Sequence, residues 1–156
     1  MAEPLRKQRA ADLNVAENVV TVERPLVGTP IHQAYRVLKF AFTIAPLIAG
    51  VDKFFHFLVN WDQYLTPIVP NALNVDAHTL MLIGGAIEIV AGIGVALKPR
   101  IFAYIVSLWL IGIVINLLLT GQYFDIALRD FGLALGAFAL GRLSQWFDPN
   151  VRPART

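Results

Sequence analysis

Residues 79–119 read TLMLIGGAIEIVAGIGVAL-KPR-IFAYIVSLWLIGIVINLLL, and this stretch decides the fold. Two apolar runs, Thr79–Leu97 and Ile101–Leu119, are separated only by Lys98-Pro99-Arg100. Each run is close to the ~20 residues that a helix needs to cross roughly 30 Å of hydrocarbon. The connection is so short that the second helix has to fold back against the first. The stretch therefore predicts an antiparallel pair of transmembrane helices.

Two further apolar runs flank this pair, at Val37–Val59 and Phe124–Leu143. Apolar residues make up 56% of the 156-residue chain and charged residues only 15%, with a mean hydropathy of +0.59. Soluble domains carry roughly 25% charged residues, so this chain lacks the charged surface that water requires. Strands are not expected, because the runs do not alternate and sheet edges facing lipid would be unsatisfied. The sequence predicts an all-α membrane protein, an antiparallel bundle of four transmembrane helices.

The two ends of the chain and the connections indicate its orientation. Residues 1–34 are predicted to form a cytoplasmic leader, partly disordered, with a short helical turn around Ala10–Val20. Residues 35–146 hold the four-helix domain, and residues 147–156 form a cytoplasmic tail. The leader, the tail and the turn at residues 98–100 are basic, whereas the other two connections contain no Lys or Arg. By the positive-inside rule, both termini are expected in the cytoplasm.

Glycines on two of the predicted helices indicate close packing between helices. Gly84 and Gly92 lie on one stripe of the second helix. Gly132 and Gly136 form a small-xxx-small pair on the fourth. Such positions let helix backbones approach each other closely.

The longest connection, residues 60–78, joins the first and second helices. It contains Pro67 and Pro70 and is expected to form a lid on the outer face. Trp61 and Tyr64 at its start are expected to be interfacial anchors, because amphipathic rings concentrate at the headgroup level.

Polar side chains inside the predicted helices mark the candidate site, because each charge in hydrocarbon costs several kcal/mol unless it is paired or hydrated. The set consists of Asp52, Lys53, His56, Glu88, Asn116, Arg129 and Asp130. Counting along each helix in its own direction places Glu88 near the midplane and the others toward the outer face. All four helices thus contribute polar groups to one half of the bilayer. The sequence predicts one outer-half cluster, either a ligand-binding site or a buried ionic network.

Spacing suggests pairs within this cluster. Asp52 and His56 are four residues apart and share a helix face. Lys53 is rotated by about 100° from Asp52 and is expected to snorkel outward. Glu88 has no charged neighbour on its own helix, so its partner has to come from across the bundle. Arg129 is the first candidate, and protonation of Glu88 at neutral pH is the alternative.

Three roles for the cluster remain open at this point. The charges can fix the register and orientation of the helices, form a ligand or cofactor pocket that opens to the outer face, or belong to a proton or ion path. A path is disfavoured, because the inner halves of the four predicted helices carry no Asp, Glu or His, and Lys39 and Arg142 lie only at their inner ends.

Several other chemistries are excluded or not expected. The chain has no cysteine, which excludes disulfides, thiolate metal sites and cysteine nucleophiles. His56 and His78 are the only imidazoles on the outer side, and His78 is expected in an interfacial or capping role, so no metal or haem site is predicted. The glycines from Gly84 to Gly94 lie inside an apolar helix without a preceding strand, so they form no nucleotide-binding loop. No basic stripe with interleaved aromatics is present, so no nucleic-acid partner is expected.

The pattern of the membrane region carries a family resemblance. Its parts are Gly50-Val51-Asp52-Lys53-Phe54-Phe55-His56 at the end of the first helix, Glu88 within a glycine-rich second helix, and Arg129-Asp130 near the start of the fourth. In this pattern residues 35–145 resemble the DoxX-like family of small four-helix membrane proteins. The resemblance implies a multi-pass protein of the bacterial inner membrane, an accessory subunit of a redox system that handles quinone or helps a membrane or periplasmic redox partner reach the quinone pool. No catalytic residue and no covalent cofactor transfer with it.

Quinone binding would need a hydrogen-bond donor beside an apolar slot. His56, Lys53, Arg129 and Asn116 are the candidate donors, and Phe54, Phe55 and Phe57 are the candidate lining. The alternatives are a structural or assembly protein of the membrane without catalysis and, third, a small-solute carrier.

Overall fold

The computed structural model describes residues 28–147, and every regular element in this range is helical. The elements are α2 (Pro30–Phe55), the 3-10 helix η1 (Trp61–Tyr64), α3 (Ile68–Leu73), α4 (Ala77–Leu97), α5 (Pro99–Leu119) and α6 (Phe124–Phe147). No strand occurs between residues 28 and 147, which confirms the predicted all-α class. The predicted turn around residues 10–20 and most of the predicted leader and tail lie outside the described residues.

Three of the described helices, α2, α4 and α5, are long and apolar enough to cross a membrane. Large apolar side chains stay exposed along them, for example Phe40 at 68% and Val90 at 62%. Lipid accommodates such surfaces, whereas water does not. These helices indicate a membrane protein, in agreement with the sequence. The fourth long helix, α6, has 24 residues, but Asp125, Arg129 and Asp130 interrupt its apolar run.

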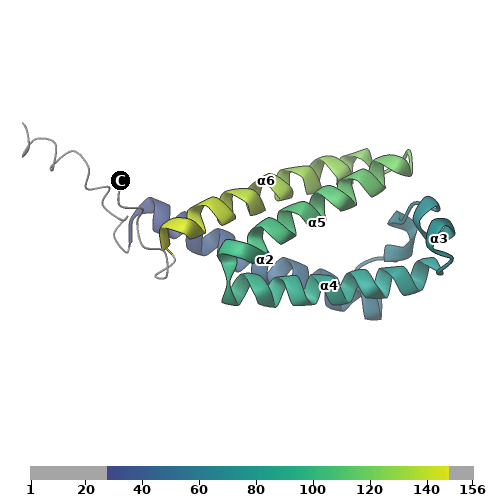
Figure 1. Cartoon of the computed structure of the whole chain (residues 1–156), viewed down its shortest axis with the longest axis horizontal. Helices are drawn as coiled ribbons and strands as arrows, with labels where there is room; N and C mark the ends of the chain where they lie inside the picture. The colour runs from purple at the N-terminus through teal and green to yellow at the C-terminus, as the bar shows by residue number, and fades with distance from the viewer. Residues whose placement is uncertain (1–27, 148–156) are drawn as a thin grey trace, which may run out of the picture.

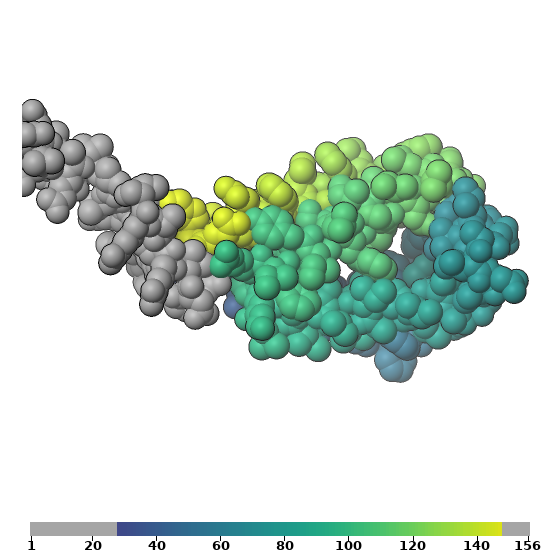
Figure 2. Space-filling view, in the orientation of Figure 1, coloured from purple at the N-terminus to yellow at the C-terminus, as the bar shows by residue number. Residues whose placement is uncertain are grey.

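The long helices form two pairs, α2 with α4 and α5 with α6 (Figure 1). Contacts between the pairs are fewer and run mainly from α4 to α5 and from α2 to α6. The pairs lie closest near the α4–α5 turn and spread apart toward α3 (Figure 1). Figure 2 shows the resulting hollow between α4 and α5. One end of the bundle is therefore tightly packed and the other is open.

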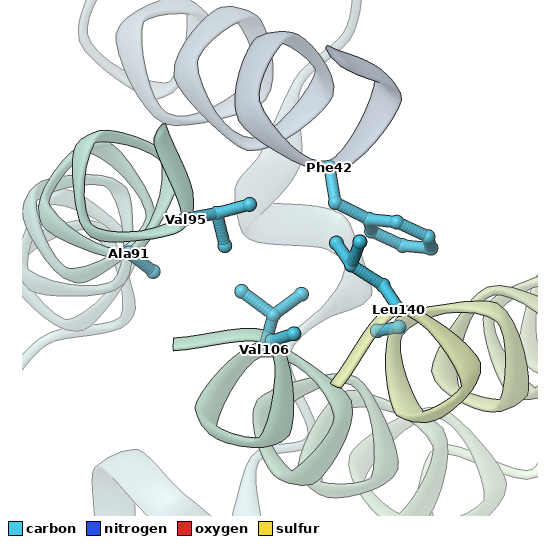
Figure 3. Packing of buried hydrophobic residues seen from close by; sticks show 7 residues of the cluster. Phe42, Ala91, Val95, Val106 and Leu140 are labelled. Atoms are coloured by element: carbon cyan, nitrogen blue, oxygen red, sulfur yellow. The ribbon is translucent and has the colours of Figure 1, made fainter. Parts of the chain in front are cut away.

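The apolar core lies at the packed end. Figure 3 shows Phe42 of α2, Ala91 and Val95 of α4, Val106 of α5 and Leu140 of α6 converging on a common centre. Each of these side chains is at most 7% exposed. Because lipid tails are as apolar as these residues, tight van der Waals packing holds this end together.

The ends of α2 differ from those of the predicted apolar run Val37–Val59. The helix begins earlier, at Pro30, whose fixed φ suits the first helical position, and Thr29 is its N-cap. It ends earlier, at Phe55, because His56 adopts the left-handed conformation with φ of 55°. The apolar run thus continues past the helix into a loop.

The start of α4 is set by a capping side chain. The carboxylate of Asp76 accepts hydrogen bonds from the hydroxyl and the backbone N–H of Thr79, both at 2.7 Å. These bonds, that of the hydroxyl first, lower the pKa of Asp76 below its usual value. Asp76 therefore provides the cap, and His78, for which a capping role was considered, is the second residue of the helix.

A close contact between glycines brings α2 and α4 together. A Cβ atom added at Gly50 would lie 2.6 Å from the Gly85 carbonyl oxygen, and one added at Gly85 would lie 2.8 Å from the Gly50 carbonyl oxygen. No larger residue fits at either position without moving the helices apart. Gly92 faces the backbone of Thr43 in the same way, as predicted, but Gly85 rather than Gly84 makes the second contact.

The predicted glycine pair on α6 is half correct. Gly136 faces the ring of Phe42, which would lie 3.2 Å from an added Cβ atom. Around Gly132 the same test finds no atom within 4 Å, so this glycine makes no close helix contact within residues 28–147.

Candidate functional site

An ion pair buried between α2 and α4 is the centre of the candidate site. Lys53 Nζ lies 2.6 Å from Glu88 Oε2, and the two side chains are only 6% and 9% exposed. Trp109 of α5 donates its ring N–H to the other carboxylate oxygen, Glu88 Oε1, at 3.3 Å. Both oxygens of Glu88 are therefore engaged, and α5 is tied to the α2–α4 pair.

The partner of Glu88 is thus Lys53, and the predicted pairing with Arg129 is wrong. The expectation that Lys53 snorkels outward is also wrong. The glycine contact explains both results. A Cβ atom added at Gly85 would lie 3.0 Å from Lys53 Cβ, and one added at Gly50 would lie 3.1 Å from Glu88 Cβ, so both side chains start where the helices are closest.

Trp61 of η1 connects this ion pair to Asp52. The ammonium of Lys53 lies 3.9 Å from the centroid of the Trp61 ring, in a cation–π contact. The ring N–H of Trp61 donates to Asp52 Oδ2 at 2.7 Å. Trp61, predicted to be an interfacial anchor, is therefore part of the polar cluster.

Asp52 also holds the chain where it leaves α2. Its Oδ1 accepts hydrogen bonds from the backbone N–H groups of Phe57 at 2.9 Å and Leu58 at 3.0 Å. These bonds and the left-handed His56 turn the chain back over the end of the helix. Residues 56–76 then form a loop cap that contains η1 and α3 and lies at the open end of the bundle (Figure 1).

Asn116, near the end of α5, ties the loop cap to the second helix pair. Its side-chain N–H donates to the carbonyl of Tyr64 at 2.6 Å, and its side-chain oxygen accepts from the N–H of Thr66 at 3.0 Å. The ring of Tyr64 also packs edge-on against Tyr123, with centroids 4.9 Å apart. The loop cap is thus anchored on α2 through Asp52 and on α5 through Asn116.

Arg129 and Asp130 form a separate pair on α6. Arg129 Nε lies 3.0 Å from Asp130 Oδ1, but the Arg129 side chain is 63% exposed, whereas that of Asp130 is 10% exposed. Among the described residues, the hydrogen bonds of Glu88 go to Lys53 and Trp109, and neither Arg129 nor Asp130 takes part. The predicted single cluster is therefore divided into an α2–α4 network, an Asn116 anchor and an α6 pair.

His56 belongs to a further group at the surface of the loop cap. Because it leaves the helix in the left-handed conformation, it does not share a helix face with Asp52 as predicted. Its ring stacks on that of His78 with centroids 5.5 Å apart, and His78 Nδ1 lies 3.1 Å from Asp62 Oδ2. The prediction of no metal site rested on His56 and His78 alone. The structure places the Asp62 carboxylate beside them.

The sequence reasoning missed the roles of Trp61, Asp62 and Trp109. All three are polar or amphipathic groups next to predicted membrane charges. A signal was present, because the segment Asn60-Trp61-Asp62-Gln63-Tyr64 interrupts an apolar stretch with several hydrogen-bonding side chains. Such groups near buried charges need partners of their own.

A shallow apolar groove runs along α2 beneath the loop cap. It has a volume of about 500 Å³. Its lining consists of Leu47, Ile48, Val51, Asp52, Phe55, Phe57 and Leu58. Of the three phenylalanines predicted to line such a slot, Phe55 and Phe57 do and Phe54 does not, and the predicted donors are absent from the lining.

Comparison with known proteins adds no relative. No family model, no curated protein and no solved structure matches this chain.

Proposed function

We propose that the chain is a multi-pass protein of a bacterial inner membrane with four transmembrane helices, α6 being the fourth, and both termini in the cytoplasm. Supporting this, α6 has 24 residues and packs along α5, which is itself long and apolar enough to span. Its charges Asp125, Arg129 and Asp130 lie in the first two turns, near the interface. The lack of Lys and Arg in the loop cap supports an outer location for it.

Cysteine labelling tests this topology, because the natural chain has no cysteine. Single cysteines at Asn74 and Gln122 are expected to react with a membrane-impermeant maleimide on intact cells. A cysteine at Thr156 is expected to react only after permeabilisation. If α6 does not cross the membrane, Thr156 will be labelled from the same side as Gln122, and the four-span topology is wrong. The unmodified chain is the control for background labelling.

We propose further that this protein is a non-catalytic accessory subunit, in which Lys53, Glu88 and Trp109 form an ionic lock that joins α2, α4 and α5, and the loop cap faces a partner. The observation that carries this is that Lys53 and Trp109 both bond to Glu88, so the three side chains are used to join helices. None of the three lines the groove on α2. The resemblance to DoxX-like proteins supplies the redox context for the partner.

A second function, quinone binding, is favoured by the groove. Its apolar lining and its volume of about 500 Å³ suit part of an isoprenoid molecule lying against α2. The polar group in its lining, Asp52, is an acceptor that already receives hydrogen bonds from Trp61 and from the backbone. A quinone carbonyl would need a donor there, so the lock is the better supported proposal.

Complementation of a deletion strain tests the lock, and the quinone extracted with the purified protein tests the groove. The double variant Lys53→Met/Glu88→Leu keeps the helices together without charge, so it is expected to complement as well as the wild type. Loss of complementation at normal abundance would overturn the lock.

If quinone binds in the groove, Val51→Trp lowers the quinone extracted with the purified protein by at least about tenfold. Val90→Trp, on an exposed part of α4, is the matched control and retains it.

A further inference from the structure

Three side chains that commonly ligate metals meet at the loop cap. His56 follows the end of α2, Asp62 belongs to η1, and His78 lies in the first turn of α4. One ligand atom from each lies within 4.8 Å of the others. The closest approach is between His78 Nδ1 and Asp62 Oδ2, at 3.1 Å. His56 and His78, which are 22 residues apart in sequence, thus lie in one small cluster with Asp62.

The second carboxylate oxygen of Asp62 gives an independent reason to expect a ligand. Oδ1 of Asp62 is buried and accepts no hydrogen bond from any residue between 28 and 147. A buried polar atom without a partner is costly, so native proteins usually satisfy it. A cation bound beside the carboxylate would supply the missing partner.

The backbone at these positions is held by other interactions. The N–H of His56 bonds to the Asp52 carbonyl at 2.6 Å, where the left-handed turn ends α2. The N–H of Asp62 bonds to the side-chain oxygen of Asn60 at 3.1 Å, which starts η1. His78 sits in a regular helix behind a capped N-terminus. The three side chains therefore project from positions that do not need a metal to form.

We propose that His56, Asp62 and His78 bind one divalent transition-metal ion, with zinc as the simplest occupant and water completing its coordination. Two imidazoles and one carboxylate suit Zn²⁺ and its first-row neighbours rather than Mg²⁺ or Ca²⁺, which prefer oxygen ligands. With bonds of about 2.0–2.1 Å, the ligands of a tetrahedral zinc ion lie about 3.3 Å apart. Small side-chain rotations close the present separations to that distance.

The position of the site determines what the ion does. It connects the end of α2, η1 and the start of α4. Lys53 lies in the last turn of α2 and Trp61 in η1, so two members of the polar network are close to it in sequence. The His78 side chain is 53% exposed, so an ion reaches the site from water. Metal binding therefore braces the loop cap from its outer side, and this inference does not depend on the proposed accessory role.

The test uses the full chain, purified in detergent without a histidine tag and treated with a chelator. Titration calorimetry is expected to show one Zn²⁺ per chain, with a rise in melting temperature that Mg²⁺ and Ca²⁺ do not produce. Asp62→Asn and His78→Gln are each expected to weaken Zn²⁺ binding at least about tenfold, because each removes one of three protein–metal bonds. The visible absorption of bound Co²⁺ is expected to weaken in the same variants.

His32→Gln is the matched control, because His32 is the remaining histidine and packs against Tyr35 and, edge-on, against Phe147 at the other end of α2. It is expected to leave the affinity for Zn²⁺ unchanged. Melting without metal identifies any variant that misfolds. His56→Asn then serves as a replacement, since asparagine tolerates the left-handed backbone. Absence of Zn²⁺ binding, or binding that none of the three ligand variants weakens, overturns the site.

Discussion

Replacing Glu88 alone with leucine is expected to lower the free energy of unfolding by about 3–5 kcal/mol, because the buried ammonium of Lys53 loses its partner. The ring N–H of Trp109 loses its acceptor in the same step. Lys53→Met is expected to have a similar effect, since it leaves the Glu88 carboxylate buried without its cation. Unfolding by SDS titration, followed by circular dichroism, measures both losses.

The double variant Lys53→Met/Glu88→Leu distinguishes the net contribution of the ion pair to stability from the destabilisation caused by a single unpaired charge. Removing both charges leaves no unpaired ion, so most of the lost stability is expected to return. The two single losses will then be strongly non-additive. A loss below about 1 kcal/mol in either single variant, as found for exposed pairs, would contradict the burial of this ion pair.

Gly50→Ala is expected to destabilise the bundle by about 1–3 kcal/mol, as overpacking does at other tight contacts. The added Cβ atom would lie 2.6 Å from a backbone oxygen of α4 and 2.9 Å from the Ile89 side chain, and the backbone cannot rotate away. The helices have to separate instead, which also lengthens the Lys53–Glu88 contact beside these glycines. SDS titration measures the loss of stability.

Gly132→Ala is the matched control for this prediction. It makes the same chemical change inside a helix, but an added Cβ atom meets no atom within 4 Å in residues 28–147. Alanine favours helix by up to about 1 kcal/mol over glycine, so this variant is expected to be neutral or slightly stabilised. Equal losses in Gly50→Ala and Gly132→Ala would show that the contact between α2 and α4 is not specific.

The helices were predictable because their limits are encoded locally. The ends of α4 and α5 follow from the apolar runs and the Lys98-Pro99-Arg100 turn, and the structure agrees within two residues. The end of α2 was not predictable in this way. Phe57 and Leu58 look like a continuation of the helix, but the left-handed His56 and the carboxylate of Asp52 turn the chain.

The members of the candidate site were easier to predict than their partners. A charge in a membrane helix is recognisable from its position, so Lys53 and Glu88 were both expected to matter. Their pairing depends on how α2 and α4 are rotated about their axes. The contact between Gly50 and Gly85 sets that rotation. Nothing in the sequence distinguishes these two glycines from the other glycines of the membrane helices. Spacing along one helix therefore could not distinguish Lys53 from Arg129 as the partner.

The order in which the paired charges are synthesised has a consequence for membrane insertion. Lys53 precedes Glu88 by 35 residues, so at about 5–20 residues per second the ribosome delivers the cation roughly 2–7 s before its anion. Until Glu88 is synthesised, Lys53 in the last turn of α2 can extend its amine toward the lipid headgroups. Glu88, in the middle of α4, has no such exit and enters the bilayer when its counter-ion is already present. Glu88 can therefore be neutralised as soon as α4 packs against α2.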